Sequence, residues 1–246
     1  MNIHELEKDV TTEELYPYWN DMFKRADIKV LVAIPTYDFK IHLQVMMGLF
    51  MLWKPKEFAI RYSPGPTIDV NRNKLVDMAL MDEKVTHVLF IDTDTMPPPN
   101  LLSRFLQYDE LVMSGLYIQR MVPFRCTQFL KFSNNSFRRL RVADYPEGEL
   151  VKVDSTGAGA LLVKREVFER LEEPYFKFIL TDGGKNYLGE DIYFCRKLAE
   201  EGIPIHVDTS IMCQHIEGGL AFPHLFEKGL LKIGEKMKDY GESEIT

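Results

Sequence analysis

The amino-acid sequence predicts one α/β domain, in which a half with a parallel sheet merges with a half that has a mixed sheet. Strand-like and helix-like stretches alternate four times over the ~80 residues that follow Lys29, which is typical of a parallel sheet with helices on both faces. After Leu111 the strand-like stretches follow one another without helices between them. No repeat or linker divides the chain, so we expect a single continuous domain.

The composition excludes several classes of protein. With 246 residues, 46% hydrophobic and 27% charged, the chain should bury roughly three quarters of its unfolded surface without a disulfide or a structural metal. A net charge of -7 argues against a long nucleic-acid surface. The cysteines Cys126, Cys195 and Cys213 show no CxxC spacing, which fits a reducing compartment. The N-terminus lacks the apolar region of a secretory signal, and no apolar run reaches roughly 18 residues. We therefore expect a cytoplasmic protein.

The first half supplies the alternating elements. A polar helical lead-in is expected before the first buried strand, KVLVAIP, which ends at a proline. The breaker Pro64-Gly65-Pro66 closes the second strand, and Pro97-Pro98-Pro99 precedes a helix that starts at Asn100. The expected elements are a lead-in at 1–27, strands at 29–35, 57–63 and 86–92, and helices at about 40–53, 67–81 and from 100 onward.

The second half changes in pattern. Three strand-like stretches come first, and then a strand that opens with small residues runs into a short helix. A loop at Gly183-Gly184 precedes a helix that Gly202 ends. These elements lie at 111–118, 125–132, 149–155, 157–165 and 189–202, followed by a strand at 203–208. The sequence thus divides into the lead-in, halves at 28–110 and 111–216, and an amphipathic C-terminal segment at 217–246.

Asp92-Thr93-Asp94 directly follows the most apolar strand of the sequence, THVLFID. Because side chains alternate along an extended chain, we expect both carboxylates on one face, at the edge where α/β sheets bind ligands. Adjacent carboxylates repel each other unless a cation is present, and a hard divalent cation that also binds phosphate oxygens meets that need. The alternative is a solvated loop with an Asp that caps a helix.

Arg72 gives a second, independent signal. It lies on the apolar face of the expected helix at 67–81, together with Ile68 and Val76. A guanidinium group that points inward must find an anion, because an unpaired charge in a core is costly. Asp69, one turn earlier, could supply that anion. A bound diphosphate is the alternative, since helix N-termini and guanidinium groups both favour phosphate oxygens.

Three weaker signals lie in the second half. The small residues 155–160 permit close approach of a ligand or of another backbone, although a β-bulge explains them equally well. Glu190-Asp191 opens a helix, where acidic residues ordinarily serve the helix dipole. Of the late histidines His206, His215 and His224, His215 becomes a ligand candidate only if it folds back beside Asp94.

Taken in order, these segments resemble the GT-A-fold glycosyltransferases, especially those like glycosyltransferase family 2, over about residues 29–216. DxD alone is a weak motif, and the order and spacing of all the segments carry the resemblance. Two departures stand out: Tyr62-Ser63-Pro64 replaces the Asp with which the family usually reads the nucleobase, and the QxxRW motif of processive synthases is absent. The matching motifs are Pro35-Thr36-Tyr37 at the end of the first strand, Arg72-Asn73, the DxD-like Asp92-Thr93-Asp94, Gly189-Glu190-Asp191 and His215.

This resemblance implies a Rossmann-like nucleotide-binding half merged with a mixed-sheet acceptor half. It implies a metal-dependent hexosyltransferase that transfers a single sugar from a UDP- or GDP-linked donor to a hydroxyl of a glycan, lipid-linked or protein acceptor, with inversion favoured. Asp191 would be the catalytic base, and Mn2+ or Mg2+ would bind Asp92, Asp94 and His215. The donor would contact Pro35, Tyr37, Asp69, Arg72, Asp92 and Thr93, and the acceptor would contact Gly157, Ala158, Gly159 and Glu190.

Other interpretations stay open. A non-catalytic module that binds sugars or nucleotides would share the fold and the acidic residues. A phosphatase of the haloacid-dehalogenase type also uses an Asp-x-Asp after an apolar strand, but its motif wants Thr or Val where this chain has Met96. The C-terminal segment carries Leu225, Phe226, Leu230, Ile233 and Met237 at helical spacing, with lysines among them. It would cap the core or contact an anionic membrane peripherally.

Overall fold

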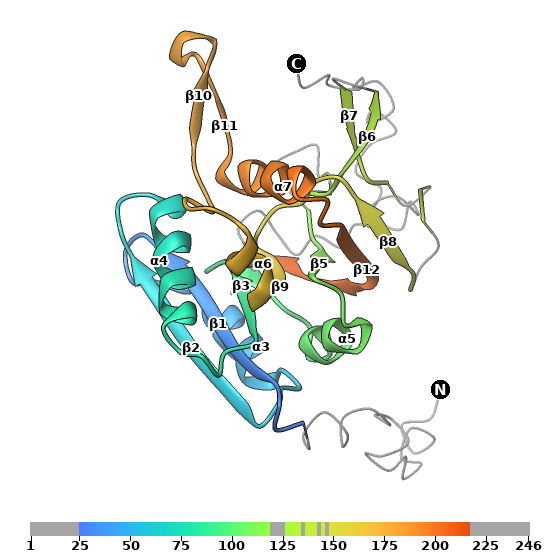
Figure 1. The fold of residues 1–246 in the computed structure, drawn as a ribbon. Coiled ribbons are helices and arrows are strands. Elements are labelled where there is room, and N and C mark those ends of the chain that lie inside the picture. The colour runs from blue at the N-terminus through green and yellow to red at the C-terminus, as the bar shows by residue number, and fades with distance from the viewer. Residues whose placement is uncertain (1–24, 119–125, 134–135, 142–143, 146–147, 217–246) are drawn as a thin grey trace.

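The computed structural model describes residues 25–118, 126–133, 136–141, 144–145 and 148–216. Its centre is a seven-stranded mixed sheet in the order β2-β1-β3-β9-β5-β12-β8 (Figure 1). The predicted α/β fold with a mixed sheet is confirmed. The strands are β1 Lys29–Thr36, β2 Glu57–Pro64, β3 His87–Ile91, β5 Val112–Leu116, β8 Leu150–Val153, β9 Ala160–Lys164 and β12 Ile205–Met212.

Five of these strands run in the same direction. β1 pairs in parallel with β2 and β3, and β12 pairs in parallel with β5. The antiparallel β9 lies between β3 and β5 and joins the two halves into one sheet. β8 is the last strand of the sheet and pairs antiparallel with β12. The ends of β1, β2, β3, β5 and β12 therefore meet at one edge, together with the start of β9. We call this the carboxyl edge.

Helices cover both faces of the sheet, because its strands are apolar on both sides. Leu31 and Ala33 of β1 point into one core, whereas Val30 and Val32 point into the other. Helices α4 (Ile68–Leu80), α6 (Arg165–Arg170) and α7 (Glu190–Glu200) pack on the first core, and α3 (Leu43–Met51) and α5 (Leu101–Tyr108) on the second.

Three two-stranded pairs complete the described fold. β4 (Thr95–Met96) pairs with β13 (Gln214–His215), so the chain after β12 folds back onto the segment that follows β3. β6 (Phe129–Ser133) pairs with β7 (Ser136–Arg139). β10 (Ile179–Thr181) and β11 (Asn186–Leu188) form a hairpin that projects from the body (Figure 1). The sequence predicted only a loop at Gly183-Gly184, which is the tip of that hairpin.

The terminal predictions lie almost wholly outside the described residues. Residues 25–27 form a turn and a short connection into β1, and the rest of the expected lead-in is not described. The amphipathic segment from Leu225 to Met237 is likewise outside the described part of the chain. Among the described helices, none has the length and apolar character needed to cross a membrane.

Candidate functional site

The turn Asp92-Thr93-Asp94 leaves β3 at the carboxyl edge, and backbone hydrogen bonds from distant segments hold it there. The Asp92 amide donates to the Gly159 carbonyl (3.1 Å), and the Thr93 and Asp94 carbonyls accept from the amides of His42 (3.0 Å) and Ile216 (2.9 Å). These segments precede α3, precede β9 and follow β13. The predicted carboxylate pair therefore lies where four parts of the chain converge.

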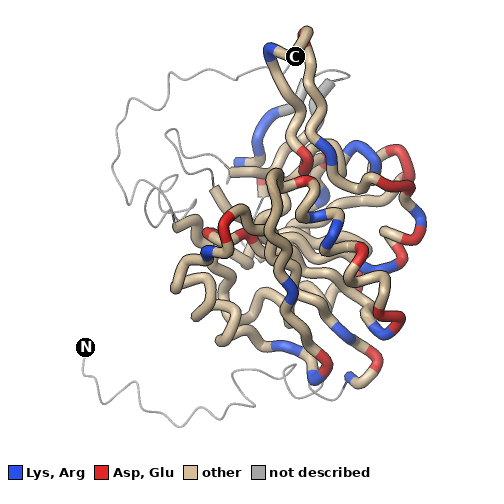
Figure 2. Tube along the Cα trace, turned by 90° about the vertical axis from the view of Figure 1, so that its left-hand side faces the viewer, with Lys and Arg blue, Asp and Glu red and all other residues tan. Residues whose placement is uncertain are grey.

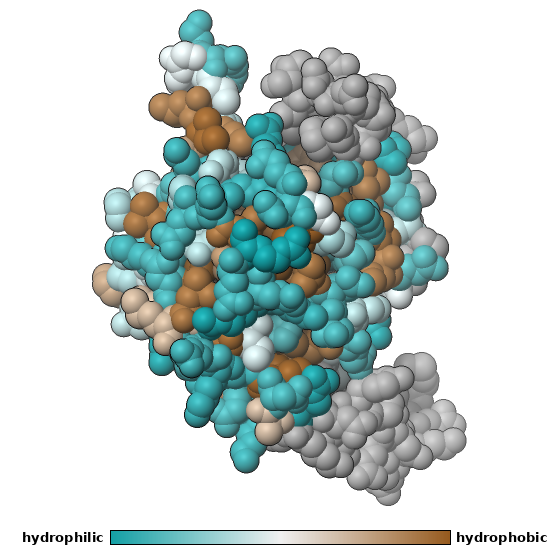
Figure 3. Space-filling model, in the orientation of Figure 1, coloured by the Kyte–Doolittle hydropathy of each residue, from teal (hydrophilic) through white to brown (hydrophobic). Residues whose placement is uncertain are grey.

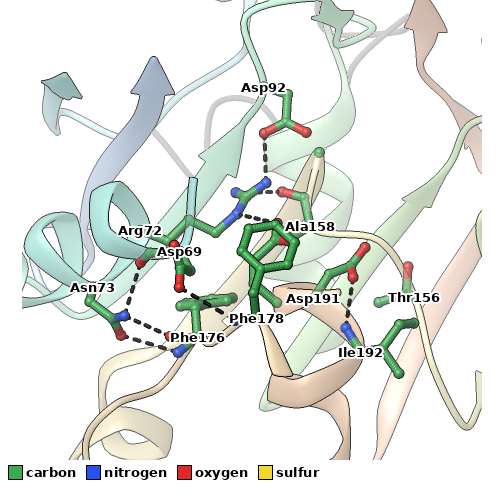
Figure 4. A network of polar contacts seen from close by, with 12 residues as sticks. Asp69, Arg72, Asn73, Asp92, Thr156, Ala158, Phe176, Phe178, Asp191 and Ile192 are labelled. Carbon is green, nitrogen blue, oxygen red and sulfur yellow. Dashed lines mark hydrogen bonds and ion pairs between the residues drawn. The ribbon is translucent and has the colours of Figure 1, made fainter. Parts of the chain in front are cut away.

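Arg72 points inward from α4, as its helical spacing predicts, and its side chain is only 3% exposed. Its Nη2 donates to Asp92 Oδ1 (2.7 Å) and its Nη1 to the Ala158 carbonyl (3.2 Å), as Figure 4 shows. Its Nε donates to Glu190 Oε1 (3.3 Å). The guanidinium also lies 5.6 Å and 5.8 Å from the ring centres of Phe90 and Phe176. Burial alone would lower the pKa of Arg72, but the carboxylates of Asp92 and Glu190 outweigh it and raise that pKa. Arg72 is thus a fixed positive charge that joins β3, α7 and the start of β9.

Asp69 is not the carboxylate that pairs with Arg72. Its Oδ2 accepts from the Phe178 amide at 3.4 Å, and the neighbouring Asn73 side chain accepts from the amides of Tyr175 and Phe176 at 2.9 and 3.1 Å. Both residues therefore tie α4 to the segment that leads into the β10–β11 hairpin (Figure 4). The donor contact of Asp69 stays a prediction.

His215 does fold back beside Asp94. Its Nε2 lies 3.4 Å from Asp94 Oδ1, and both side chains are almost buried. The other ring nitrogen, Nδ1, lies 2.7 Å from the Ile118 carbonyl. Because a carbonyl oxygen only accepts, Nδ1 must carry the proton. Nε2 is therefore the ring nitrogen that faces the Asp94 carboxylate. A metal-binding histidine has the same arrangement, with one ring nitrogen toward the metal site and the other held by an outer hydrogen bond.

Tyr117 is a site residue that the sequence analysis missed. It follows β5 at the carboxyl edge, its hydroxyl accepts from the Gly159 amide (2.9 Å), and its ring packs edge-on against His215. A Cβ at position 157 would overlap that hydroxyl, and one at 159 would lie 3.0 Å from Asp92 Oδ2. Positions 157 and 159 therefore require glycine, because Tyr117 and Asp92 leave little or no room for a side chain there. Burial raises the pKa of Tyr117, so its hydroxyl keeps its proton.

Glu190 and Asp191 open α7 and face the same edge. Glu190 is buried against Arg72, and the Asp191 Oδ1 accepts from the Ile192 amide at 2.7 Å. Burial, and then the charge of Glu190, raise the pKa of Asp191 to about 7. A Cβ at position 157 would lie 3.5 Å from Asp191 Oδ2, so this carboxyl group borders the predicted acceptor stretch. Asp191 has the proton affinity of a group that exchanges protons near neutral pH.

The remaining predicted residues lie around this centre. Pro35 is buried in β1 opposite Ser63 of β2, whereas Tyr37 is 60% exposed just beyond the strand. Tyr37 directly follows β1 and therefore lies at the carboxyl edge, beside the site. Partial burial, followed by the charge of Glu190, raises the pKa of Tyr37. His206, in β12, lies away from this centre, with its Nδ1 3.3 Å from Glu110 Oε2. His224 is outside the described residues.

The site as a whole is rich in negative charge. The carboxyl groups of Asp92, Glu190 and Asp191 lie around the guanidinium of Arg72, and the carboxyl group of Asp94 lies beside His215. Within the described residues no group of three or more His, Cys, Asp or Glu side chains is arranged to hold a metal ion. A cavity of about 550 Å³ lies elsewhere, between α7 and the base of the hairpin, and none of the predicted site residues lines it.

Comparisons with known proteins support the fold. No protein-family model matches the chain, and no curated protein sequence matches it. The solved structure described as A197 from STIV is similar, with 20% identity and a TM-score of 0.54 over 77% of this chain and 86% of that chain. A structure of GalNAc-T7 with UDP, GalNAc and Mn2+ aligns at 10% identity and a TM-score of 0.45 over 81% of this chain and 46% of that chain. The chain therefore shares its fold with A197, and its seven-stranded mixed sheet is consistent with a single GT-A-like domain.

Proposed function

We propose that the protein is a glycosyltransferase that moves a single sugar from a UDP- or GDP-linked donor to an acceptor hydroxyl. The observation that carries this proposal is the convergence of Asp92, Asp94 and His215 with Arg72 and Asp191 at one edge of the sheet. These five side chains come from segments up to 143 positions apart in the sequence. The order of the motifs in the sequence supports the same chemistry independently.

A divalent cation fits the donor set. Carboxylate oxygens suit both Mg2+ and Mn2+, and Mg2+ typically uses one or two carboxylates together with substrate phosphates. An imidazole nitrogen is a poorer ligand for the hard Mg2+ than for a first-row transition metal, so a histidine in the donor set favours Mn2+ over Mg2+. Asp94 and His215 supply one carboxylate and one imidazole, and the bond from Nδ1 to Ile118 holds the ring with Nε2 toward Asp94. In this proposal Asp94 and His215 would hold the cation, and Asp92, which is paired with Arg72, would border the donor. When bound, the cation would neutralise charge that develops on the leaving diphosphate.

The residues of the chain perform the other tasks. Arg72 keeps Asp92 and Glu190 in place and adds positive charge at the diphosphate. Gly157, Ala158 and Gly159 let the acceptor come close to Asp191, whose carboxylate removes the proton from the acceptor hydroxyl as that oxygen attacks the anomeric carbon. Glu190 orients the acceptor. Pro35, Tyr37, Asp69 and Thr93 border the donor.

Nucleotide binding and slow donor hydrolysis test this proposal. Wild-type protein should bind UDP or GDP more tightly with Mn2+ than with EDTA, and it should slowly hydrolyse the matching nucleotide sugar. Asp94→Asn should abolish the difference between Mn2+ and EDTA, whereas Asp109→Asn, an exposed carboxylate near the opposite edge, should preserve it. Nucleotide binding without any hydrolysis would indicate a non-catalytic binding module. Preferential hydrolysis of phosphate monoesters would indicate the phosphatase.

A further inference from the structure

Hydrophobic exposure on the described surface is concentrated in one short stretch of the chain. Seven of the twelve large hydrophobic side chains that are exposed lie between residues 37 and 62, with exposed fractions of 51–74%. Single exposed apolar residues are ordinary, but a contiguous group marks an interaction surface. We call this group the α3 patch, and it comprises Tyr37, Phe39, Leu43, Met47, Phe50, Met51 and Tyr62.

The geometry of α3 makes the patch continuous. Leu43, Met47, Phe50 and Met51 recur at helical spacing on the outer face of α3, whereas Val45 and Leu49 are buried in the core. α3 contains no charged residue. Apart from Gln44, every residue of α3 is apolar or glycine, so the outer face of α3 carries more apolar surface than a helix that borders water usually does.

Neighbouring strand residues extend the patch. Phe58, Ile60 and Tyr62 alternate along the edge strand β2 and therefore point to one face. Phe58 and Ile60 pack against the same core as α3. The rings of Phe39 and Tyr62 meet edge to face, with centres 6.1 Å apart. The apolar surface thus runs from α3 to the end of β2 at the carboxyl edge.

The charges beside the patch distinguish between possible occupants. Between residues 37 and 62 there are four Lys or Arg and two Asp or Glu, whereas the whole chain has 30 and 37. Lys54 lies 5.3 Å from the centre of the Phe58 ring and also donates to the Phe50 carbonyl. In Figure 2 most of the described residues on the left-hand side are uncharged, whereas acidic and basic residues gather on the right-hand side.

An apolar face bordered by cations matches an anionic bilayer, because apolar side chains insert among the acyl chains and lysines bind the anionic headgroups. A second copy of the chain would instead bring two cationic borders together. We propose that the α3 patch docks the protein on an anionic membrane. Tyr37 belongs both to the patch and to the border of the site, so docking would place the carboxyl edge near the bilayer. A site held near the bilayer would favour an acceptor that is carried by the membrane, and this consequence rests on the proposed function.

Vesicle sedimentation with the full-length protein tests the docking without any donor or acceptor. Wild-type protein should sediment with phosphatidylcholine vesicles that contain phosphatidylglycerol, and less with phosphatidylcholine alone or at high salt. Met47→Glu should weaken partitioning by roughly tenfold or more, because it places a charge in the apolar face. Met81→Glu is the matched control, since Met81 is 84% exposed at the end of α4, and it should change partitioning by less than about twofold.

Each other outcome overturns the proposal. Equal partitioning of wild type and Met47→Glu would place membrane contact elsewhere, for example in the C-terminal segment. If wild type does not sediment with anionic vesicles and Met47→Glu converts a dimer to a monomer, the patch is a self-association surface. If wild type does not sediment and Met47→Glu lowers the melting temperature far more than Met81→Glu, the patch is covered by the chain itself. Vesicle binding also stands or falls independently of nucleotide binding, so failure of the proposed function is distinguishable.

Discussion

Replacing Arg72 with methionine separates a structural role from a ligand role for the most buried charge of the site. Methionine keeps most of the apolar stem and removes the guanidinium. In the structure this change leaves Asp92 and Glu190 without their shared cation and the Ala158 carbonyl without its donor. Both carboxylates would then lie close to Asp191 with no guanidinium group between them.

The expected loss of stability follows from burial. Removing one partner of a buried ion pair typically costs about 3–5 kcal/mol, because the other charge stays uncompensated. For a protein of this size, 1 kcal/mol corresponds to a shift of roughly 2–4 °C in melting temperature, so Arg72→Met should melt about 6–20 °C lower. Arg25→Met is a matched control: Arg25 and Asp27 are also 2.7 Å apart, but both side chains are more than half exposed. A surface pair contributes about 0–1 kcal/mol.

Thermal unfolding of the two variants and calorimetric titration with UDP and GDP in Mn2+ provide the assay. We expect Arg72→Met to melt far below Arg25→Met and to bind the nucleotide diphosphate more weakly, since both roles use the same group. If both variants melt alike, the reasoning from burial is refuted. A large drop in melting temperature with unchanged nucleotide affinity would remove the diphosphate role and leave Arg72 purely structural.

Three further predictions concern Asp191 and Gly157. An asparagine at position 191 cannot accept a proton, so Asp191→Asn should reduce sugar transfer by roughly 100-fold or more while nucleotide affinity stays nearly unchanged. The control Glu190→Gln should change the acceptor KM more than turnover. Near-wild-type turnover of Asp191→Asn would contradict the inverting mechanism. The pKa of Asp191 is raised from 3.8 to about 7 by folding, so the unfolded chain binds fewer protons between these values and this residue lowers stability as pH rises from about 4 to 7. Wild-type transfer should rise with pH around 7, and denaturant titrations should show that Asp191→Asn lacks this stability loss. Gly157→Ala should destabilise the protein by about 1–3 kcal/mol, because the new Cβ overlaps the Tyr117 hydroxyl, and Tyr117→Phe should restore part of that loss; additive effects in chemical denaturation would contradict this contact.

Local sequence patterns predict those features of the fold that depend on neighbours along the chain. The apolar run before Asp92 indicates a buried strand, and β3 is completely buried. Helical spacing places Arg72 on the apolar face of α4, and the side chain is indeed buried with Leu75 and Val76. In both cases the periodicity of one element is sufficient, because burial of an apolar face determines which side chains point inward.

Partners that come from distant segments could not be predicted in this way. Asp69 was the local candidate for Arg72, yet the structure pairs Arg72 with Glu190, 118 residues later. The antiparallel insertion of β9 between β3 and β5 brings Gly159 beside Asp92, and no local pattern encodes the order of strands. Tyr117 was missed for the same reason, although its place just after an apolar strand was a usable signal. The β10–β11 hairpin was also missed. Its strands are short, and Leu180 and Tyr187 face solvent. Figure 3 shows hydrophobic residues on part of the projecting hairpin.

The way the Asp92-Thr93-Asp94 turn is held has a thermodynamic consequence for any ligand. Amides from His42 and Ile216 and the Gly159 carbonyl fix its backbone, and the β4–β13 pair closes it from the far side. Ordering a loop during association normally reduces affinity, because conformational entropy is lost at that moment. Here folding has already fixed the backbone on which both carboxylates stand. Binding at this turn should therefore be preorganised, with little of the interaction energy consumed in arranging the protein.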